Sequence, residues 1–405
     1  MMIKNTVAKT VALLTAVVGL SILSGQWWGS KSEELDLPEI QIVSETQTIA
    51  EISRVNEIPL AVVLSALKVD SASSEITDLV ALNLKAEEAA TKIKKSLITY
   101  YENQSKNWLK IFMKFLLWLL LLPIPAVMIA RGKMTPPRRR LVYLISIVTF
   151  GIVLGSDPSP MGTVKDAIFL LSAHKTIFWP RIIALVIFLA TVVVSTKLIC
   201  SWGCQFGTLQ DLLFRFVRNK KDRKGTVKQF KPPFWISNST RILFFLASIA
   251  VGIIWALDIV GLVDPFKVYK PLVLGIGAAL FIAVVLVASF FVYRPWCHFA
   301  CPFGLVSWFF EKLAIFRINV DYSKCDACQV CNASCPSTVM DAILKQDRPR
   351  PDCFGCGVCV ESCPTNVISL TSSRKQTGDY SDALRAMEVK RETFRKKAEE
   401  RRKND

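Results

Sequence analysis

Long runs of apolar residues, separated by shorter polar segments, form the main pattern along this chain. The runs cover residues 7–23, 111–130, 141–155, 182–199, 242–263 and 272–292. A helix of about 20 apolar residues crosses the hydrocarbon core of a bilayer. We therefore predict an α-helical integral membrane protein with about five or six transmembrane helices, in which the run at 141–155 is short for a span.

The first run carries Lys4 and Lys9 at its start and is followed by Trp27 and Trp28. No clean A-x-A cleavage site follows it, and tryptophans are common at membrane interfaces. We interpret residues 1–28 as a signal anchor, with a cleaved signal peptide as the alternative. Both interpretations place the next segment on the exported side.

Residues 29–107 are soluble in character, and we expect them to form a small exported helical module. Thr48 and Glu51 have the spacing of a capping box ahead of a short helix, and Pro59 begins a second one. A long polar helix from Lys85 then leads into the membrane. The segment contains no cysteine, histidine or glycine-rich phosphate loop, so we predict a docking or spacer role without chemistry of its own.

The net charge of +17 is distributed unevenly between the loops. Basic residues concentrate in loops 131–140 and 215–231, whereas 156–178 and 264–271 are almost balanced in sign. Because basic loops favour the cytoplasmic side, we expect these loops and the C-terminus to be cytoplasmic in a bacterial inner membrane. Residues 371–405 are predicted to form a charged helical tail. No basic domain with a nucleic-acid motif is present, so membrane lipid is the expected surrounding and nucleic acid is not.

Eight cysteines form the pattern C-x2-C-x2-C-x3-C-P twice between residues 325 and 364. This is the spacing of a bacterial two-cluster ferredoxin, in which the fourth cysteine of each run binds the other cluster. Zinc ribbons and disulfides rarely use three cysteines at this spacing before Cys-Pro. Residues 315–370 are therefore predicted to be a small α+β ferredoxin domain. We assign one [4Fe–4S] cluster to Cys325, Cys328, Cys331 and Cys363, and the second to Cys353, Cys356, Cys359 and Cys335.

The remaining cysteines form two C-x3-C motifs within the predicted helix bundle, residues 108–314. Each motif follows one span of a predicted pair, so the chain contains two related helix-pair units. Together the motifs supply four thiolates, enough for a third iron–sulfur cluster at the cytoplasmic face. Redox-active dithiols or disulfides, and binding of copper or another soft metal, are the alternatives. The four residues are Cys200, Cys204, Cys297 and Cys301.

Between about residues 141 and 370 the chain resembles the NapH/NosR-type membrane polyferredoxins. The resemblance rests on the ferredoxin motifs, on Cys200–Cys204 followed by Phe206-Gly207-Thr208-Leu209, and on Cys297–Cys301 followed by Pro302-Phe303-Gly304. Gln205 stands where the first motif of the family has proline, and the covalent-flavin motif of the NosR type is missing before the membrane. The resemblance implies quinol oxidation, or electron relay during the maturation of other redox enzymes.

The chain has only two histidines, His174 and His298, which cannot supply the paired ligands of two membrane haems. We expect His298, inside the second C-x3-C motif, to pack beside the site instead of binding metal. A lipid-soluble quinone is then the expected membrane partner, and its site needs proton-accepting groups. Asp258 lies inside an apolar run and is a weak candidate for this site, as is His174. Further carboxylates on the outer side are Asp157, Asp166 and Asp264.

Two smaller features bear on these sites. Lys197 lies three residues before Cys200, where its charge would tune a cluster. Residues 163–177 are predicted to form an amphipathic helix on the outer surface.

The leading hypothesis is a membrane-bound iron–sulfur protein, an electron-transfer subunit of the quinol dehydrogenase type, that exchanges electrons between the quinone/quinol pool and a redox partner through ferredoxin clusters. One alternative is a maturation factor that reduces a metal or a disulfide of a client enzyme. Another is a subunit that anchors and wires a larger oxidoreductase complex.

Overall fold

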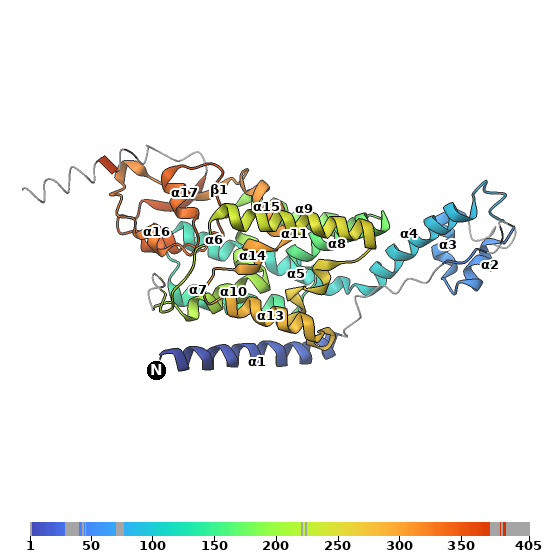
Figure 1. Ribbon diagram of the computed structural model, residues 1–405, viewed down its shortest axis with the longest axis horizontal. Helices are drawn as coiled ribbons and strands as arrows, with labels where there is room; N and C mark the ends of the chain where they lie inside the picture. Colours follow the sequence, from blue (N-terminus) through green and yellow to red (C-terminus); the bar gives the residue numbers. More distant parts are fainter. Residues whose placement is uncertain are drawn as a thin grey trace, which may run out of the picture.

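The structure, a computed structural model, describes residues 2–28, 40–42, 44, 46–69, 77–219, 222, 225–372, 381 and 384–385. Figure 1 shows an elongated molecule with a small helical module at one end, a helix bundle in the middle and a ferredoxin-like unit at the other end. Each of these three parts has its own cluster of buried apolar side chains. The tail predicted at 371–405 lies almost entirely outside the described residues.

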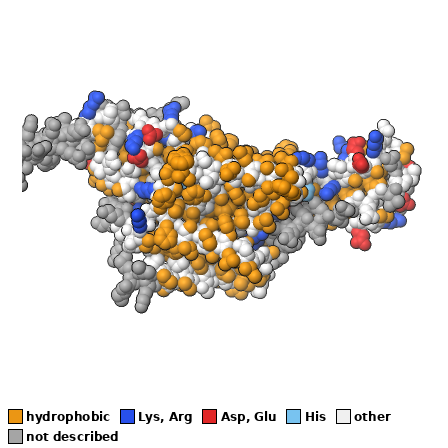
Figure 2. Space-filling view, viewed as in Figure 1, with side chains coloured by type: hydrophobic (Ala, Val, Ile, Leu, Met, Phe, Trp, Pro, Cys, Tyr) orange, Lys and Arg blue, Asp and Glu red, His pale blue; other side chains and the backbone are white. Residues whose placement is uncertain are grey.

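Three helical stretches among the described residues are long and apolar enough to cross a membrane: Thr6–Trp28, Trp108–Ala130 and Phe234–Trp255. They correspond to α1 (Met2–Trp28), to α5 (Trp108–Leu121) with α6 (Pro123–Ala130), and to α11 (Phe234–Trp255). The apolar helices α9 (Trp179–Val194) and α13 (Ile276–Ala288) are shorter. Hydrophobic side chains cover the middle of the molecule in Figure 2, which is the surface expected against lipid.

The predicted span at 141–155 is not one continuous α-helix, and we call the interrupted segment from α7 to α8, residues 136–174, the broken crossing. Helix α7 (Pro136–Ser146) continues into a π-helix, η2 (Ile147–Val153), and then into an irregular turn before α8 (Pro160–His174). Lys114 of α5 donates hydrogen bonds to the carbonyls of Gly155 and Ser156 in that turn. Backbone carbonyls freed inside an apolar bundle need such a donor because no water satisfies them.

The predicted outer-surface helix at 163–177 was wrong in its position. Helix α8 packs against α9, α11 and α15 (Pro302–Glu311), and its Met161 and Leu170 side chains are buried. Ser172 of α8 also lies where a Cβ on Gly252 of α11 would be, so the two helices approach closely. The polar positions of this segment serve contacts inside the protein instead of contacts with water.

The predicted apolar span at 242–263 ends early. Helix α11 stops at Trp255, Ala256 adopts a positive φ of 50°, and Asp258 caps the short helix α12 (Ile259–Leu262) through the amide of Gly261. Asp258 is therefore outside the spanning helix. The segment continues through η4 (Pro265–Tyr269) and η5 (Pro271–Val273) and folds back into the bundle, where the Tyr269 hydroxyl donates to the carbonyl of Gln205.

The two C-x3-C motifs end equivalent helices. Helix α9 leads to η3 (Ile199–Gly203) and α10 (Gln205–Phe216), and α13 leads to α14 (Pro295–Phe299) and α15. In each unit an apolar helix is followed by a short turn of helix carrying the first cysteine, and then by a helix that starts directly after the second cysteine. The repeat expected from the sequence is thus present in the backbone.

The ferredoxin-like unit contains one antiparallel pair of strands, β1 (Phe316–Val320) and β2 (Ile368–Ser372), with Ile318 opposite Leu370. Between the strands lie η6 (Tyr322–Lys324), α16 (Val330–Ser334), α17 (Val339–Lys345) and α18 (Val358–Ser362). Strand β2 also contacts α6, so the unit is seated on the end of the bundle.

The module contains α2 (Ile49–Val55), α3 (Leu60–Leu67) and α4 (Ala86–Ser105). The predicted capping box is present: the Thr48 hydroxyl accepts from the amide of Glu51, and the Glu51 carboxylate accepts from the amide of Thr48. Part of the predicted range, residues 29–39, lies outside the described residues.

Close packing at the broken crossing gives a first prediction. A Cβ on Gly151 would lie 2.4 Å from the Tyr269 ring, whereas a Cβ on Gly277 of α13 meets nothing within 4 Å. We expect Gly151→Ala to reduce stability by about 1–3 kcal/mol through overpacking, and Gly277→Ala to leave it unchanged or slightly raised. Thermal unfolding in detergent measures both variants, and equal midpoints would show that the return segment does not pack on η2.

Candidate iron–sulfur sites

Four cysteines of the ferredoxin unit surround a cavity of about 320 Å³. They are Cys325, Cys328, Cys331 and Cys363, and the other wall residues include Val320, Leu344 and Ile368. Thiolates around an otherwise apolar space are the donor set of a [4Fe–4S] cluster. The fit supports the predicted first ligand set, in which Cys363 comes from the second cysteine run.

A second cavity, of about 400 Å³, is surrounded by Cys335, Cys353, Cys356 and Cys359. Its wall also contains Phe354 between the first two cysteines of the run, and Tyr293 from the bundle. Here the fourth cysteine comes from the first run, so the cysteines are grouped around the two cavities as in the predicted ligand sets, which stay predictions. Among the described residues, no three His, Cys, Asp or Glu side chains are grouped to hold a single metal ion.

The backbone wraps both cavities in the same way. Ala327 and Gln329, on either side of Cys328, have positive φ values, and Gly355 and Gly357 do so on either side of Cys356. The second loop uses glycine for an additional reason, because a Cβ on Gly357 would lie 2.8 Å from Ile129 and one on Gly355 would lie 3.1 Å from Thr196. The loop around the second cavity is therefore the one pressed against the bundle.

The cysteines of the two C-x3-C motifs are all buried in the core of the bundle. Burial raises the pKa of the Cys297 thiol to about 12, and it raises those of Cys200, Cys204 and Cys301 as well. Each thiol also interacts electrostatically with cysteines of the other motif. These thiols are protonated when free, and binding of a metal centre would release their protons. Four buried sulfur donors fit an iron–sulfur cluster, and this third site stays a prediction.

Cations brace the two motifs against each other. The Arg294 guanidinium, three residues before Cys297, donates to the carbonyl of Cys200 at 2.6 Å. The Lys197 ammonium, three residues before Cys200, donates to the carbonyl of Gly304 at 2.7 Å. The cation that precedes each motif thus donates a hydrogen bond to the backbone of the other motif. Arg241 of α11 completes the arrangement by donating to the carbonyl of Cys297.

Gln205 occupies the place of the expected proline without disturbing the turn. It is the first residue of α10, directly after Cys204, as Pro302 is the first residue of α15 after Cys301. Its side-chain amide donates to the carbonyl of Ser156 at 3.0 Å. The departure from the family pattern therefore ties the first motif to the turn inside the broken crossing.

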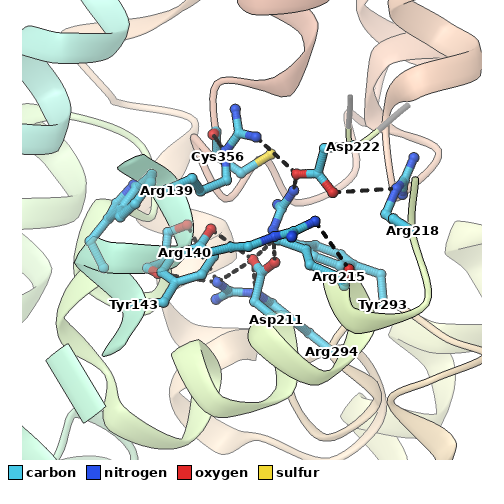
Figure 3. A network of polar contacts seen from close by, with 12 residues as sticks. Arg139, Arg140, Tyr143, Asp211, Arg215, Arg218, Asp222, Tyr293, Arg294 and Cys356 are labelled. Carbon is cyan, nitrogen blue, oxygen red and sulfur yellow. Dashed lines mark hydrogen bonds and ion pairs between the residues drawn. The ribbon is translucent and has the colours of Figure 1, made fainter. Parts of the chain in front are cut away.

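A buried ionic network lies beside the first motif (Figure 3). Asp211 of α10 accepts hydrogen bonds from Tyr143, Tyr293, Arg215 and Arg294. Burial alone would raise the pKa of Asp211, but Arg215 and Arg294 outweigh it and hold the pKa below its usual value. The carboxylate is therefore charged, and it fixes Arg294 next to the Cys200 carbonyl.

The network extends to the ferredoxin unit. Asp222 pairs with Arg215 and Arg139, and Arg139 donates to the carbonyl of Cys356 at 3.0 Å and pairs with Glu361. These contacts join α7 and α10 to the loop and helix around the second cavity. The buried ion pairs of the bundle thus continue to the residues that surround the second cavity.

Both C-x3-C motifs touch the loop between Cys353 and Cys356. Trp202, inside the first motif, donates to the carbonyl of Gly355 at 3.2 Å. His298, inside the second motif, meets the Phe354 ring at 5.3 Å between centroids. Asp352, directly before this loop, forms ion pairs with Lys197 and Arg241. One loop of the ferredoxin unit is thus held by both halves of the repeat.

The two histidines and Asp258, which the sequence singled out, have different surroundings. Burial lowers the pKa of His298 to about 4 against the opposing effect of Asp352, so the ring is neutral, and its packing role stays a prediction. His174 ends α8 beside Phe169. Asp258 is paired with Lys165 at 3.3 Å. Phe169, which contacts His174, lines a cavity together with Asp258, whereas His174 itself does not line it.

Sequence reasoning identified Lys197 but missed Arg294, Arg241, Asp211 and Asp352. Arg294 had a usable signal, because it precedes its cysteine by three residues just as Lys197 does. Asp211 has one local ion-pair partner, Arg215, four residues later, but its other partners and the ion-pair partners of Arg241 and Asp352 are distant in the sequence.

Comparison with known proteins supports iron–sulfur binding by this chain. A 4Fe-4S binding domain matches residues 176–224 and 274–320, which contain the C-x3-C motifs, and a 4Fe-4S dicluster domain matches 317–364. No solved structure matches the chain.

Three relatives share 28% identity with the chain. YccM of Escherichia coli (strain K12), which carries the name of an electron transport protein, matches over 38% of this chain and 46% of its own length. The ferredoxin-type protein NapH of Haemophilus influenzae matches over 38% and 52%, and the regulatory protein NosR of Pseudomonas aeruginosa over 34% and 19%. The chain thus spans about half or less of these relatives.

The ionic network gives a second prediction. Asp211→Asn keeps the shape of the side chain but leaves Arg294 and Arg215 as buried cations without their shared counter-ion. We expect a loss of about 3–5 kcal/mol in stability, the cost of breaking a buried pair. The exposed pair of Glu88 with Lys92 supplies the control, because Glu88→Gln should cost less than about 1 kcal/mol. Equal thermal midpoints for the two variants in detergent would contradict a structural role for Asp211.

The exchange of fourth cysteines gives a third prediction. Cys335→Ser should perturb the same cluster as Cys356→Ser, because both thiols line the second cavity, and Cys363→Ser should match Cys328→Ser. Electron paramagnetic resonance of the dithionite-reduced protein compares the four spectra. A Cys335→Ser spectrum that matches Cys328→Ser would mean that each run binds its own cluster.

Proposed function

We propose, from the premise that this chain belongs to the NapH/NosR-type membrane polyferredoxins, that it exchanges electrons between the quinone pool and a redox protein partner. An iron–sulfur cluster supplies one-electron transfer at a potential set by its charge, hydrogen bonds and exposure. The chain would hold such clusters at three four-cysteine sites, two in the ferredoxin unit and one between the C-x3-C motifs.

The observation that carries this proposal is the seating of the Cys353–Cys356 loop on both C-x3-C motifs. Phe354 lines the second cavity and also contacts His298, one residue after Cys297. Trp202 reaches the same loop from the first motif. Only side chains and short backbone segments separate the third site from the second cavity, which favours electron exchange between them.

Exposure suggests where a partner would meet the chain. Cys328 of the first cavity is exposed, whereas the cysteines between the motifs are buried. We infer that a redox protein docks at the first cavity and that the buried third site faces the membrane partner. The same order of sites serves electron flow in either direction.

Burial also bears on the maturation alternative. A dithiol that reduces a client disulfide must be accessible as a thiolate. Cys200, Cys204, Cys297 and Cys301 are each at most 8% exposed, which disfavours direct exchange with a client protein. A wiring role within a larger complex is compatible with the proposed electron path.

The fourth prediction tests the quinone step directly. Protein purified anaerobically in detergent is mixed with a reduced menaquinol analogue while visible absorbance and electron paramagnetic resonance are recorded. We expect bleaching of the iron–sulfur absorbance together with reduced-cluster signals, and the spin count tests for a third cluster. Reduction by dithionite without any exchange with quinol or quinone would refute the quinone function.

A further inference from the structure

A third cavity lies in the bundle apart from the ferredoxin unit. Helices α8, α11, α12 and α15 contribute to its wall, which is mostly apolar. The residues that matter for its chemistry are Lys165, Phe169, Phe245, Ser248, Asp258 and Pro302. An apolar cavity with a few polar groups at one side is the usual form of a small-molecule site.

The polar side of this cavity is an ion-pair cluster centred on Lys165. The Lys165 ammonium lies 3.3 Å from Asp258, 3.6 Å from Asp264 and 3.0 Å from Asp166. A single cation thus faces three carboxylates in a largely buried setting, with Asp157 and Lys270 paired nearby. Burial raises the pKa of Asp264 against the opposing effect of Lys165, so a proton is held more readily there than on an ordinary carboxylate.

The apolar side of the cavity lies next to the third cysteine site. Pro302, which directly follows Cys301, forms part of the wall. A molecule in the cavity would therefore be separated from the Cys301 position by little more than one residue.

The cavity is also close to the lipid-facing surface. Leu257, a wall residue, is 46% exposed, and Ile253 and Ile254 on the adjoining turn of α11 are 56% and 64% exposed. Exposed side chains of this kind on a spanning helix face lipid. The surroundings suit a ligand that arrives from the bilayer.

We propose that this cavity binds the ring of a quinone or quinol, with Asp258 and Lys165 contacting the ring oxygens and Pro302 at the side toward Cys301. This inference rests on the proposed function and places its membrane reaction. The ring would bind at the opening of this cavity, and its isoprenoid tail would extend into the lipid past Leu257.

The reaction at this site balances as follows. Oxidation of one quinol breaks two O–H bonds and releases two electrons and two protons. The electrons leave one at a time toward the iron–sulfur sites and finally to the redox protein partner, which is the oxidant. The protons pass to the carboxylates around Lys165, and quinone reduction reverses every step.

A chain of ion pairs leads from this cluster to the module end of the bundle. Asp166 pairs with Arg181 at the start of α9, and Arg181 pairs with Glu102 on α4 at 2.8 Å. Asp166 and Glu102 can each accept a proton on the way out from the quinol, whereas the Arg181 guanidinium has no acceptor and only holds the two carboxylates in line. Asp166 is then a positioning residue for proton exit, not a residue that touches the ring.

The test uses two variants of the full-length protein and one matched control. Asp258→Asn keeps a capping oxygen for Gly261 but removes the charge, and we expect quinol-driven cluster reduction to slow about a hundredfold, as for loss of a proton acceptor. Ser248→Phe fills the cavity, and it should abolish labelling of the site by a photoreactive azidoquinone. Leu246→Phe adds a similar ring at a 56% exposed position of the same helix and should change neither result.

Asp166→Asn separates proton exit from binding. We expect a lower kcat for quinol oxidation with an unchanged KM, whereas a merely structural effect would also reduce the dithionite-reducible cluster content. A raised KM with unchanged kcat would overturn the proposed exit.

The outcomes distinguish this inference from the function on which it rests. If quinol reduces the clusters of the wild-type protein but azidoquinone labels peptides outside α8, α11, α12 and α15, the cavity is not the site and the function stands. If Asp258→Asn and Ser248→Phe behave as Leu246→Phe, the inference also fails. If dithionite reduces the clusters and quinol neither reduces them nor competes with labelling, both the function and the cavity assignment fall.

Discussion

Charge balance in the interior is the constraint on which this arrangement depends. Thiolate-bound clusters bring negative charge into a region of low dielectric, where an uncompensated charge is costly. Lys197, Arg241 and Arg294 are all buried at the C-x3-C motifs, and each donates to a backbone carbonyl of those motifs. Two carboxylates, Asp352 and Asp211, hold these cations in place. The cations can then oppose the charge of a cluster without being fully neutralised by any single partner.

The same contacts join the two ends of the electron path. Asp352 precedes Cys353, so the ion pairs that order the motifs also seat the ferredoxin loop. Gly355 and Gly357 allow this loop to approach Thr196 and Ile129 more closely than any larger residue would. Because hydrogen bonds and exposure tune cluster potentials, this seating affects redox behaviour as well as stability. One set of residues therefore controls both the position of the ferredoxin loop and the reduction potential of a cluster bound there.

The cysteine sets were predictable because ligand spacing is a local property of the sequence. Apolar run length likewise identified the spanning helices at 108–130 and in α11. It failed where polar backbone enters the bundle: the break before α8 and the turn at Ala256 depend on partners such as Lys114 and Lys165, which no local pattern reveals. The buried network was out of reach for the same reason, since Asp211 and Arg294 are 83 residues apart and Lys197 and Asp352 are 155 apart.

The two irregular segments explain how charged side chains are distributed along the bundle. Irregular backbone inside a membrane protein persists where it is satisfied by neighbours and serves a site. Both irregular segments end beside a C-x3-C motif. Ser156 and Tyr269 form hydrogen bonds with Gln205, which follows Cys204. Asp258 lines the same cavity as Pro302, which follows Cys301. The two segments bring carboxylates to the module side of the motifs, whereas the buried cations lie toward the ferredoxin unit. The proposed quinol site would lie between them and would separate the two products of quinol oxidation, because protons are attracted toward the carboxylates and electrons toward the cations.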